Sequence, residues 1–147
     1  MIRWGSLREA ESELCAWARE RLLQPPAFLA TVRADGSPRV HPVTPVLTDD
    51  GLYLFMEPTS PKGADIRERR LFALHNGVRD DAGTGGELII TGSGVLTTDA
   101  DVRRVATASA AYEPADRYIL FELLVGEVHC NAYGDVPLPT TRRWKAS

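Results

Sequence analysis

Two Asp-Gly turns constrain this sequence more than any other feature. Asp35-Gly36 and Asp50-Gly51 separate three runs in which apolar side chains alternate with others: Ala27 to Arg33, Arg39 to Thr48 and Leu52 to Glu57. Glycine adopts the positive φ of tight hairpin turns at no steric cost, so each turn predicts a hairpin. Two successive hairpins predict an antiparallel meander, and therefore a fold built largely of β-structure.

The rest of the chain alternates helices with further strands. A capping box at Ser6-Leu7-Arg8-Glu9 and apolar residues at helical spacing predict a helix over about 6–23, which Pro25-Pro26 would stop. Further predicted elements are helices over about 61–69 and from 98 onward, and strands over 71–76, 87–97 and 118–133, the last kinked near Gly126. Gly92 and Gly94 predict a bulge or a sharp bend. Closure removes exposed sheet edges, so we expect a six-stranded antiparallel barrel with peripheral helices.

Size and charge limit the classes of protein to which the chain can belong. Its 147 residues suit one domain over 1–147, with a helix at about 6–23, a barrel at about 27–133 and a C-terminal tail at 135–147. A net charge of −3 supplies no basic face for nucleic acid. The longest apolar run, 118–125, is too short to cross a bilayer. With two cysteines and no apolar signal segment, we expect a cytoplasmic protein that binds neither nucleic acid nor membranes.

Common catalytic and metal-binding motifs are absent from the sequence. It has no Gly-x-Gly-x-x-Gly loop, no P-loop and no Gly-x-Ser-x-Gly nucleophile turn. His41, His75 and His129 occur singly and away from the cysteines, so no metal site is predicted.

The second predicted strand has two potential cations on one face. Alternation places Arg39, His41 and Val43 on the same side, where they could hold an anion. The alternative is that this side is a solvated barrel exterior. Pro42 and Pro45 each remove a hydrogen-bond donor from the strand, which indicates an edge, a bulge or a wall against which a ligand lies.

Two further segments have the chemistry of a phosphate site and of a ring-binding site. In 59–63, the Thr59 and Ser60 hydroxyls and Lys62 meet a helix N-terminus, an arrangement that favours a phosphate. The alternative is a plain helix cap. Trp144, which lies between arginines and a lysine, could cover a flat ring system, or it could anchor a frayed tail.

Four segments carry a family resemblance: Phe28 to Val43, Asp50 to Phe55, Thr59 to Lys62 and Leu71 to Leu74. In this order they resemble the pyridoxamine 5'-phosphate oxidase-like, FMN-binding split-barrel family, best over 26–78. The resemblance implies a homodimer of split barrels with two FMN sites at the subunit interface.

The resemblance also implies roles for individual residues. Arg39 stands where a basic residue reaches the phosphate, and Ser60 and Lys62 match a phosphate-binding segment in which Pro61 replaces the usual arginine. The residues implied along the flavin ring are His41, Val43, Thr44, Met56 and Glu57. We add Thr59 and Trp144 as cofactor-binding candidates from the two segments above.

The function implied by the resemblance is that of an FMN-dependent oxidoreductase acting on a small molecule. The flavin would transfer two electrons, and no catalytic residue is assigned, although His41 or Tyr112 could donate a proton. The substrate-binding segment of true pyridoxamine phosphate oxidases is not matched by 142–145. The alternatives are an F420-dependent reductase on the same barrel, a flavin- or haem-binding protein without turnover, and a structural dimer whose cofactor site has decayed.

Overall fold

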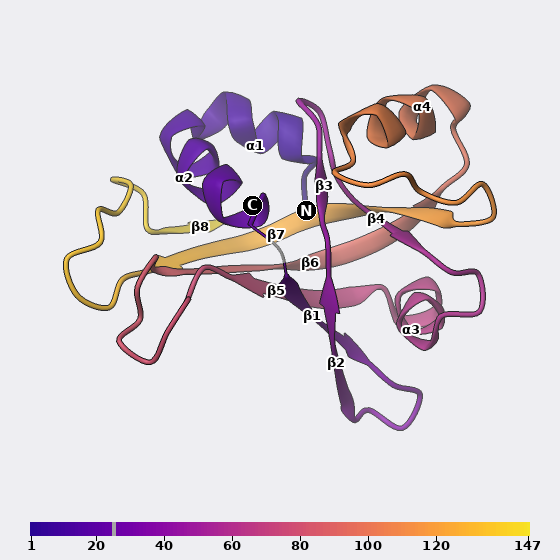
Figure 1. Cartoon of the computed structure of the whole chain (residues 1–147), viewed down its shortest axis with the longest axis horizontal. Coiled ribbons are helices and arrows are strands. Elements are labelled where there is room, and N and C mark those ends of the chain that lie inside the picture. The colour runs from indigo at the N-terminus through magenta and orange to yellow at the C-terminus, as the bar shows by residue number, and fades with distance from the viewer. Residues whose placement is uncertain (25) are drawn as a thin grey trace.

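One antiparallel sheet with helices packed around it forms this protein (Figure 1). The computed structural model describes residues 1–24 and 26–147. In chain order the elements are α1 (Trp4–Ala10), α2 (Ser12–Leu22), β1 (Ala27–Val32), β2 (Pro38–Val43), β3 (Val46–Leu47), β4 (Leu52–Met56), α3 (Pro61–Arg69), β5 (Leu71–Asn76), β6 (Glu87–Thr97), α4 (Ala100–Ser109), β7 (Ile119–Asn131) and β8 (Arg143–Lys145). The predicted mostly β, antiparallel class is confirmed. None of the described helices combines the length and apolar character needed to cross a membrane.

The order of the strands explains why the sheet curls. Within the described residues the order is β2-β1-β5-β6-β7-β4-β3, and the short β8 pairs with β7 beside this path. The predicted count of six strands is wrong, because the path has seven and the tail supplies β8. β2 and β3 lie at opposite ends of the path, yet two residues, Thr44 and Pro45, link them. So short a link keeps the two ends close together, and the sheet therefore forms a half-barrel.

The single strand predicted over 39–48 is in fact β2 and β3. Pro45 has no N–H for a ladder hydrogen bond, and pairing stops at this point. β2 pairs with β1 across the Asp35-Gly36 turn, where Gly36 has a φ of +85°. β3 pairs with β4 across the Asp50-Gly51 turn. Both predicted hairpins are confirmed, but they belong to opposite ends of the sheet and do not form a continuous meander.

The predicted helix over 6–23 is two helices. Glu11 separates α1 from α2 with a φ of −136° and a ψ of 64°, which is outside the helical region. The change of direction lets both helices bury apolar side chains, including Leu7 of α1 and Leu14 of α2, each 0% exposed. Pro25, expected to stop this helix together with Pro26, lies outside the described residues.

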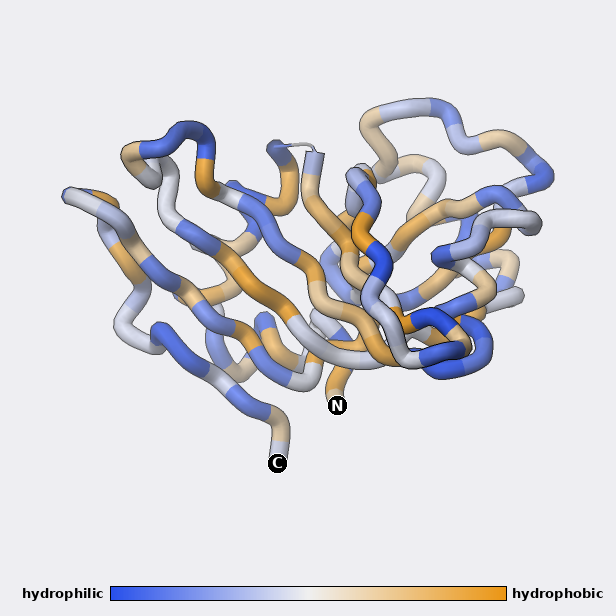
Figure 2. Tube along the Cα trace, turned by 90° about the horizontal axis from the view of Figure 1, so that it is seen from below, coloured by the Kyte–Doolittle hydropathy of each residue, from blue (hydrophilic) through white to orange (hydrophobic). Residues whose placement is uncertain are grey.

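The main core lies between the inner face of the sheet and the α1–α2 pair (Figure 1). Figure 2 shows hydrophobic residues concentrated on the strands and hydrophilic residues in many of the connecting loops. A second cluster, under α4, contains Val46, Tyr53, Phe55, Ala106 and Leu120. β4 supplies side chains to both clusters, and all five of its residues are buried. Full burial of a large apolar side chain contributes about 1.5–3 kcal/mol, so β4 is held firmly from both sides.

A bulge bends the long β6–β7 ribbon. Thr91 pairs with Glu127 and Gly92 pairs with Val125, which leaves Gly126 as the extra residue in β7. This confirms the bulge or bend predicted from the strand glycines, and it lies at the predicted kink near Gly126.

Candidate functional site

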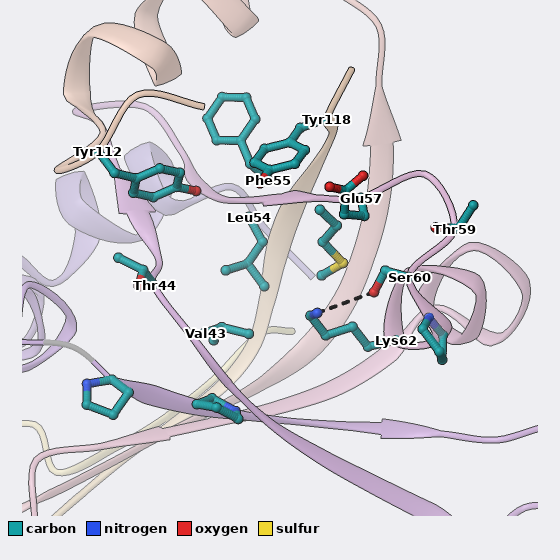
Figure 3. Close-up of a pocket in the computed structure, with 14 residues that line it drawn as sticks. Val43, Thr44, Leu54, Phe55, Glu57, Thr59, Ser60, Lys62, Tyr112 and Tyr118 are labelled. Atoms are coloured by element: carbon teal, nitrogen blue, oxygen red, sulfur yellow. Dashed lines mark hydrogen bonds between the residues drawn. The ribbon is translucent and has the colours of Figure 1, made fainter. Parts of the chain in front are cut away.

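A pocket of about 670 Å³ lies where the half-barrel is open, between the end of β2 and β4 (Figure 3). The prolines at positions 42 and 45 cannot donate ladder hydrogen bonds, so pairing does not continue from β2 across this seam. The lining residues are Pro26, Pro42, Val43, Thr44, Leu54, Phe55, Met56, Glu57, Thr59, Ser60, Pro61, Lys62, Tyr112 and Tyr118.

The polar end of the pocket is the N-terminus of α3. Ser60 is the N-cap, and its Oγ accepts a hydrogen bond from the Gly63 amide at 3.4 Å. Lys62 Nζ donates to the same oxygen at 3.3 Å and points into the pocket (Figure 3). Burial lowers the pKa of Lys62 from its ordinary value. An ammonium group, a hydroxyl and the positive end of a helix dipole together favour an anion.

A buried carboxylate holds α3 against the sheet. Asp65, which is 5% exposed, accepts hydrogen bonds from Thr31 Oγ1 at 2.7 Å, Arg39 Nε at 2.8 Å and Arg69 Nη2 at 3.2 Å. Burial by itself would raise the pKa of Asp65, but the hydrogen bonds from Arg39 and Thr31 hold it below its ordinary value. This network fixes the position of the helix that carries Lys62.

The opposite end of the pocket is aromatic. Phe55 and Tyr118 lie together there, and the Tyr112 hydroxyl faces the interior (Figure 3). Burial, and to a lesser extent Tyr118, raises the pKa of Tyr112, so its hydroxyl stays protonated and can donate a hydrogen bond. Arg117 pairs with Glu57 through both carboxylate oxygens, which ties the loop after α4 to the end of β4. The hydrogen bond from Arg117 lowers the pKa of Glu57.

The structure gathers most of the predicted site residues in this pocket. Those that line it are Val43, Thr44, Met56, Glu57, Thr59, Ser60 and Lys62. Arg39 and His41 lie on the same face of β2 as Val43 but outside the described lining. The Arg39 guanidinium pairs with Asp65. Trp144 is on β8 opposite Val128 and packs half-buried against the main core, in a different part of the molecule from the pocket.

Sequence reasoning missed several lining residues. Leu54, Phe55 and Tyr118 were not predicted to face a ligand. A strand normally has one buried face and one exposed face, and the sequence shows this as alternation. In β4, α4 covers the second face, so both faces are apolar and alternation cannot show which residues line the pocket. Tyr118 follows an irregular segment without periodicity, so only the tertiary structure brings it to the pocket.

The fold and the pocket together fit the class of split-barrel proteins: an antiparallel half-barrel with a ligand-sized opening at its seam. A sequence model described as pyridoxamine 5'-phosphate oxidase matches residues 16–128. The chain belongs to the pyridoxamine 5'-phosphate oxidase-like family, as its sequence motifs indicated. No curated protein sequence matches it significantly.

Solved structures with the same fold carry different names. A putative pyridoxamine 5'-phosphate oxidase from Listeria innocua has a TM-score of 0.63 at 15% identity, over 82% of this chain and 97% of that one. A heme binding protein from Mycobacterium smegmatis has a TM-score of 0.68 at 15% identity, over 99% of this chain and 60% of that one. A protein named F420 reductase has a TM-score of 0.54 at 19% identity, over 73% of this chain and 91% of that one. At these identities the likeness concerns the fold.

Proposed function

We propose that this chain is an FMN-dependent oxidoreductase that acts on a small molecule, and that the pocket at the seam of the half-barrel binds the FMN. The observation that carries the proposal is the Lys62 ammonium, which points into the pocket and hydrogen-bonds to Ser60. Among residues 1–24 and 26–147 it has no carboxylate partner within 4.0 Å. An uncompensated cation at a helix N-terminus is the arrangement that a phosphate monoester completes.

The remaining lining suits the rest of an FMN molecule. A volume of about 670 Å³ is in the range of cofactor pockets. Val43, Leu54 and Met56 offer an apolar surface to a flat ring. Thr44 and the Tyr112 hydroxyl can form hydrogen bonds at the edge of that ring. FMN, when bound, supplies two-electron transfer, and these residues would hold and orient it.

A homodimer is part of the proposal, and one surface of the sheet suits it. The outer face of β1, β2 and β5 carries Phe28, Val40 and Leu71, which are 45%, 62% and 54% exposed. Phe28 lies opposite Pro42, which lines the pocket, so this face borders the site. Large apolar side chains exposed together on one face of a sheet are typical of an interaction site. We propose that a second copy covers it and that the two cofactor sites lie beside the interface.

The FMN site predicts a change in affinity that depends on the phosphate. Lys62→Ala is expected to weaken FMN binding about 10- to 100-fold, because a charged hydrogen bond contributes about 1.5–3 kcal/mol. Riboflavin, which lacks the phosphate, should bind the wild type and Lys62→Ala equally well. Quenching of flavin fluorescence measures both affinities. Lys145→Ala is the control, since Lys145 is exposed and pairs with Glu127. Equal losses for FMN and riboflavin would place the phosphate elsewhere.

The dimer interface predicts a change in mass. The protein should sediment at twice its chain mass of 16.1 kDa, and Val40→Asp should yield the single chain, because a carboxylate would be buried without a partner. Val105→Asp is the matched control, since Val105 is also exposed but lies on α4. A dimer that survives Val40→Asp would contradict this interface.

A deazaflavin is the second candidate cofactor. Pro61 stands where the family resemblance implies an arginine, so one phosphate-binding charge is missing. The fold is also similar to that of a protein named F420 reductase. Mass spectrometry of the chromophore that copurifies with the gently isolated protein separates FMN from F420. If the copurified chromophore were haem, this result would support a role in binding without turnover.

A further inference from the structure

Lysine is scarce in this protein, and its two lysines lie in contrasting environments. Lys62 and Lys145 are the two lysines of the sequence, so the other members of its 17 Lys and Arg residues are arginines. Lys145 is exposed and pairs with Glu127 Oε1 at 2.8 Å, which raises its pKa. Lys62 is half-buried and lines the pocket. Arginine serves as a permanent cation, whereas lysine can lose its proton and become a nucleophile.

The surroundings of Lys62 disfavour its charged form. Its Nζ hydrogen-bonds to a neutral hydroxyl, Ser60 Oγ, at 3.3 Å. Glu57, the acidic residue that lines the pocket, pairs with Arg117, and Asp65, on the same helix as Lys62, pairs with Arg39. Two tyrosines, two threonines and apolar side chains complete the walls, and burial lowers the pKa of Lys62. A larger fraction of this amine is therefore neutral at a given pH than of Lys145.

We propose that Lys62 is a carbonyl-reactive amine and that the pocket binds aldehydes with a flat, apolar body covalently, as imines. The neutral nitrogen forms a bond to the carbonyl carbon, the two protons of the amine are transferred to the carbonyl oxygen, and that oxygen leaves as water, giving C=N without any change of oxidation state. Ser60 Oγ accepts a hydrogen bond from this nitrogen at 3.3 Å and so helps to orient it in the pocket. The aromatic end, with Phe55 and Tyr118, can receive the flat body of the aldehyde (Figure 3).

This reaction uses the same pocket as the proposed function but does not require that FMN be the cofactor. A phosphate beside Lys62 would favour its charged form, so FMN and an aldehyde should compete. The chemistry differs from the redox role, because the protein's own amine forms the bond.

Competition between the two lysines tests the proposal. The whole protein is treated with benzaldehyde and cyanoborohydride at neutral pH, and peptide mass spectrometry follows alkylation at each lysine. Lys62 should react several-fold faster than Lys145, because a larger fraction of its amine is neutral at the same pH. In urea the two rates should become equal, because the environments are lost. Reaction at Lys62 no faster than at Lys145 in the folded protein would overturn the proposal.

Two further measurements separate this inference from the proposed function. Lys62→Arg keeps a positive charge but has no reactive amine, so the rapid labelling should disappear while the slow labelling of Lys145 remains. FMN added to the native protein should slow the labelling of Lys62 and leave Lys145 unchanged. Selective labelling in a protein that does not bind FMN would refute the cofactor assignment alone. FMN binding without selective labelling would refute the imine site alone.

Discussion

Gly92→Ala is expected to destabilise the protein by about 3 kcal/mol or more, because the bulge in the β6–β7 ribbon leaves no room for a side chain. A Cβ at this position would lie 1.9 Å from the Leu124 carbonyl oxygen and 3.1 Å from the Gly126 amide nitrogen. Both atoms are backbone atoms of β7, so relief requires the ribbon itself to move. Urea denaturation followed by tryptophan fluorescence measures the loss.

Ser93→Ala is the control for this experiment. Ser93 is the next residue of β6, pairs with Leu124 and already has a Cβ. Its replacement should change the free energy of unfolding by about 0.5 kcal/mol or less. If the two variants were equally stable, the close approach of the strands at Gly92 would not exist.

Asp65→Asn is expected to cost about 2–3 kcal/mol. The change keeps the shape of the side chain but removes the charge that Arg39 and Arg69 share and replaces an acceptor oxygen by an NH₂ group. Removing one partner of a fully buried ion pair costs about 3–5 kcal/mol. The two arginine side chains here are 21% and 27% exposed, and water can compensate part of the loss. FMN affinity should fall as well, because Asp65 positions α3.

The pH dependence of this cost has a defined sign. The pKa of Asp65 is lower in the folded protein than its ordinary value of 3.8. Its contribution to stability is therefore complete above that value and is lost as pH falls through the lower folded pKa. The difference between the wild type and Asp65→Asn should be constant near neutrality and shrink below about pH 4. Glu68→Gln is the control, since Glu68 is an exposed residue of the same helix that pairs with Arg69.

Short-range signals in the sequence predicted several elements well. Ser60 and Pro61 identify the start of α3, and the observed helix covers Pro61–Arg69 as expected. The strands at 71–76 and 87–97 also have their predicted bounds. Caps, turns and alternation depend on residues a few positions apart, which is why they can be recognised without the fold.

Long-range features of the fold were not predictable in this way. The separation of β2 from β3 depends on which strands each one meets, and β8 is a strand because β7 offers it an edge. The break at Glu11 depends on how two apolar helix faces reach one core. At the β2–β3 junction and at Glu11 the local pattern was continuous and tertiary packing overrode it, whereas β8 lies in a tail for which no element was predicted.

Arg39 and Lys62, the two cations predicted to bind the phosphate, show which properties the local sequence determines and which depend on the tertiary structure. By itself the sequence determined that Arg39 lies on a strand and Lys62 at a helix start, because alternation and capping are local. Only the tertiary structure decided their environments. Asp65 lies 26 residues beyond Arg39 and pairs with it, whereas Lys62 points into the open seam beside Ser60. Charge is a property of a residue, but whether that charge is compensated depends on neighbours that folding brings from elsewhere in the chain.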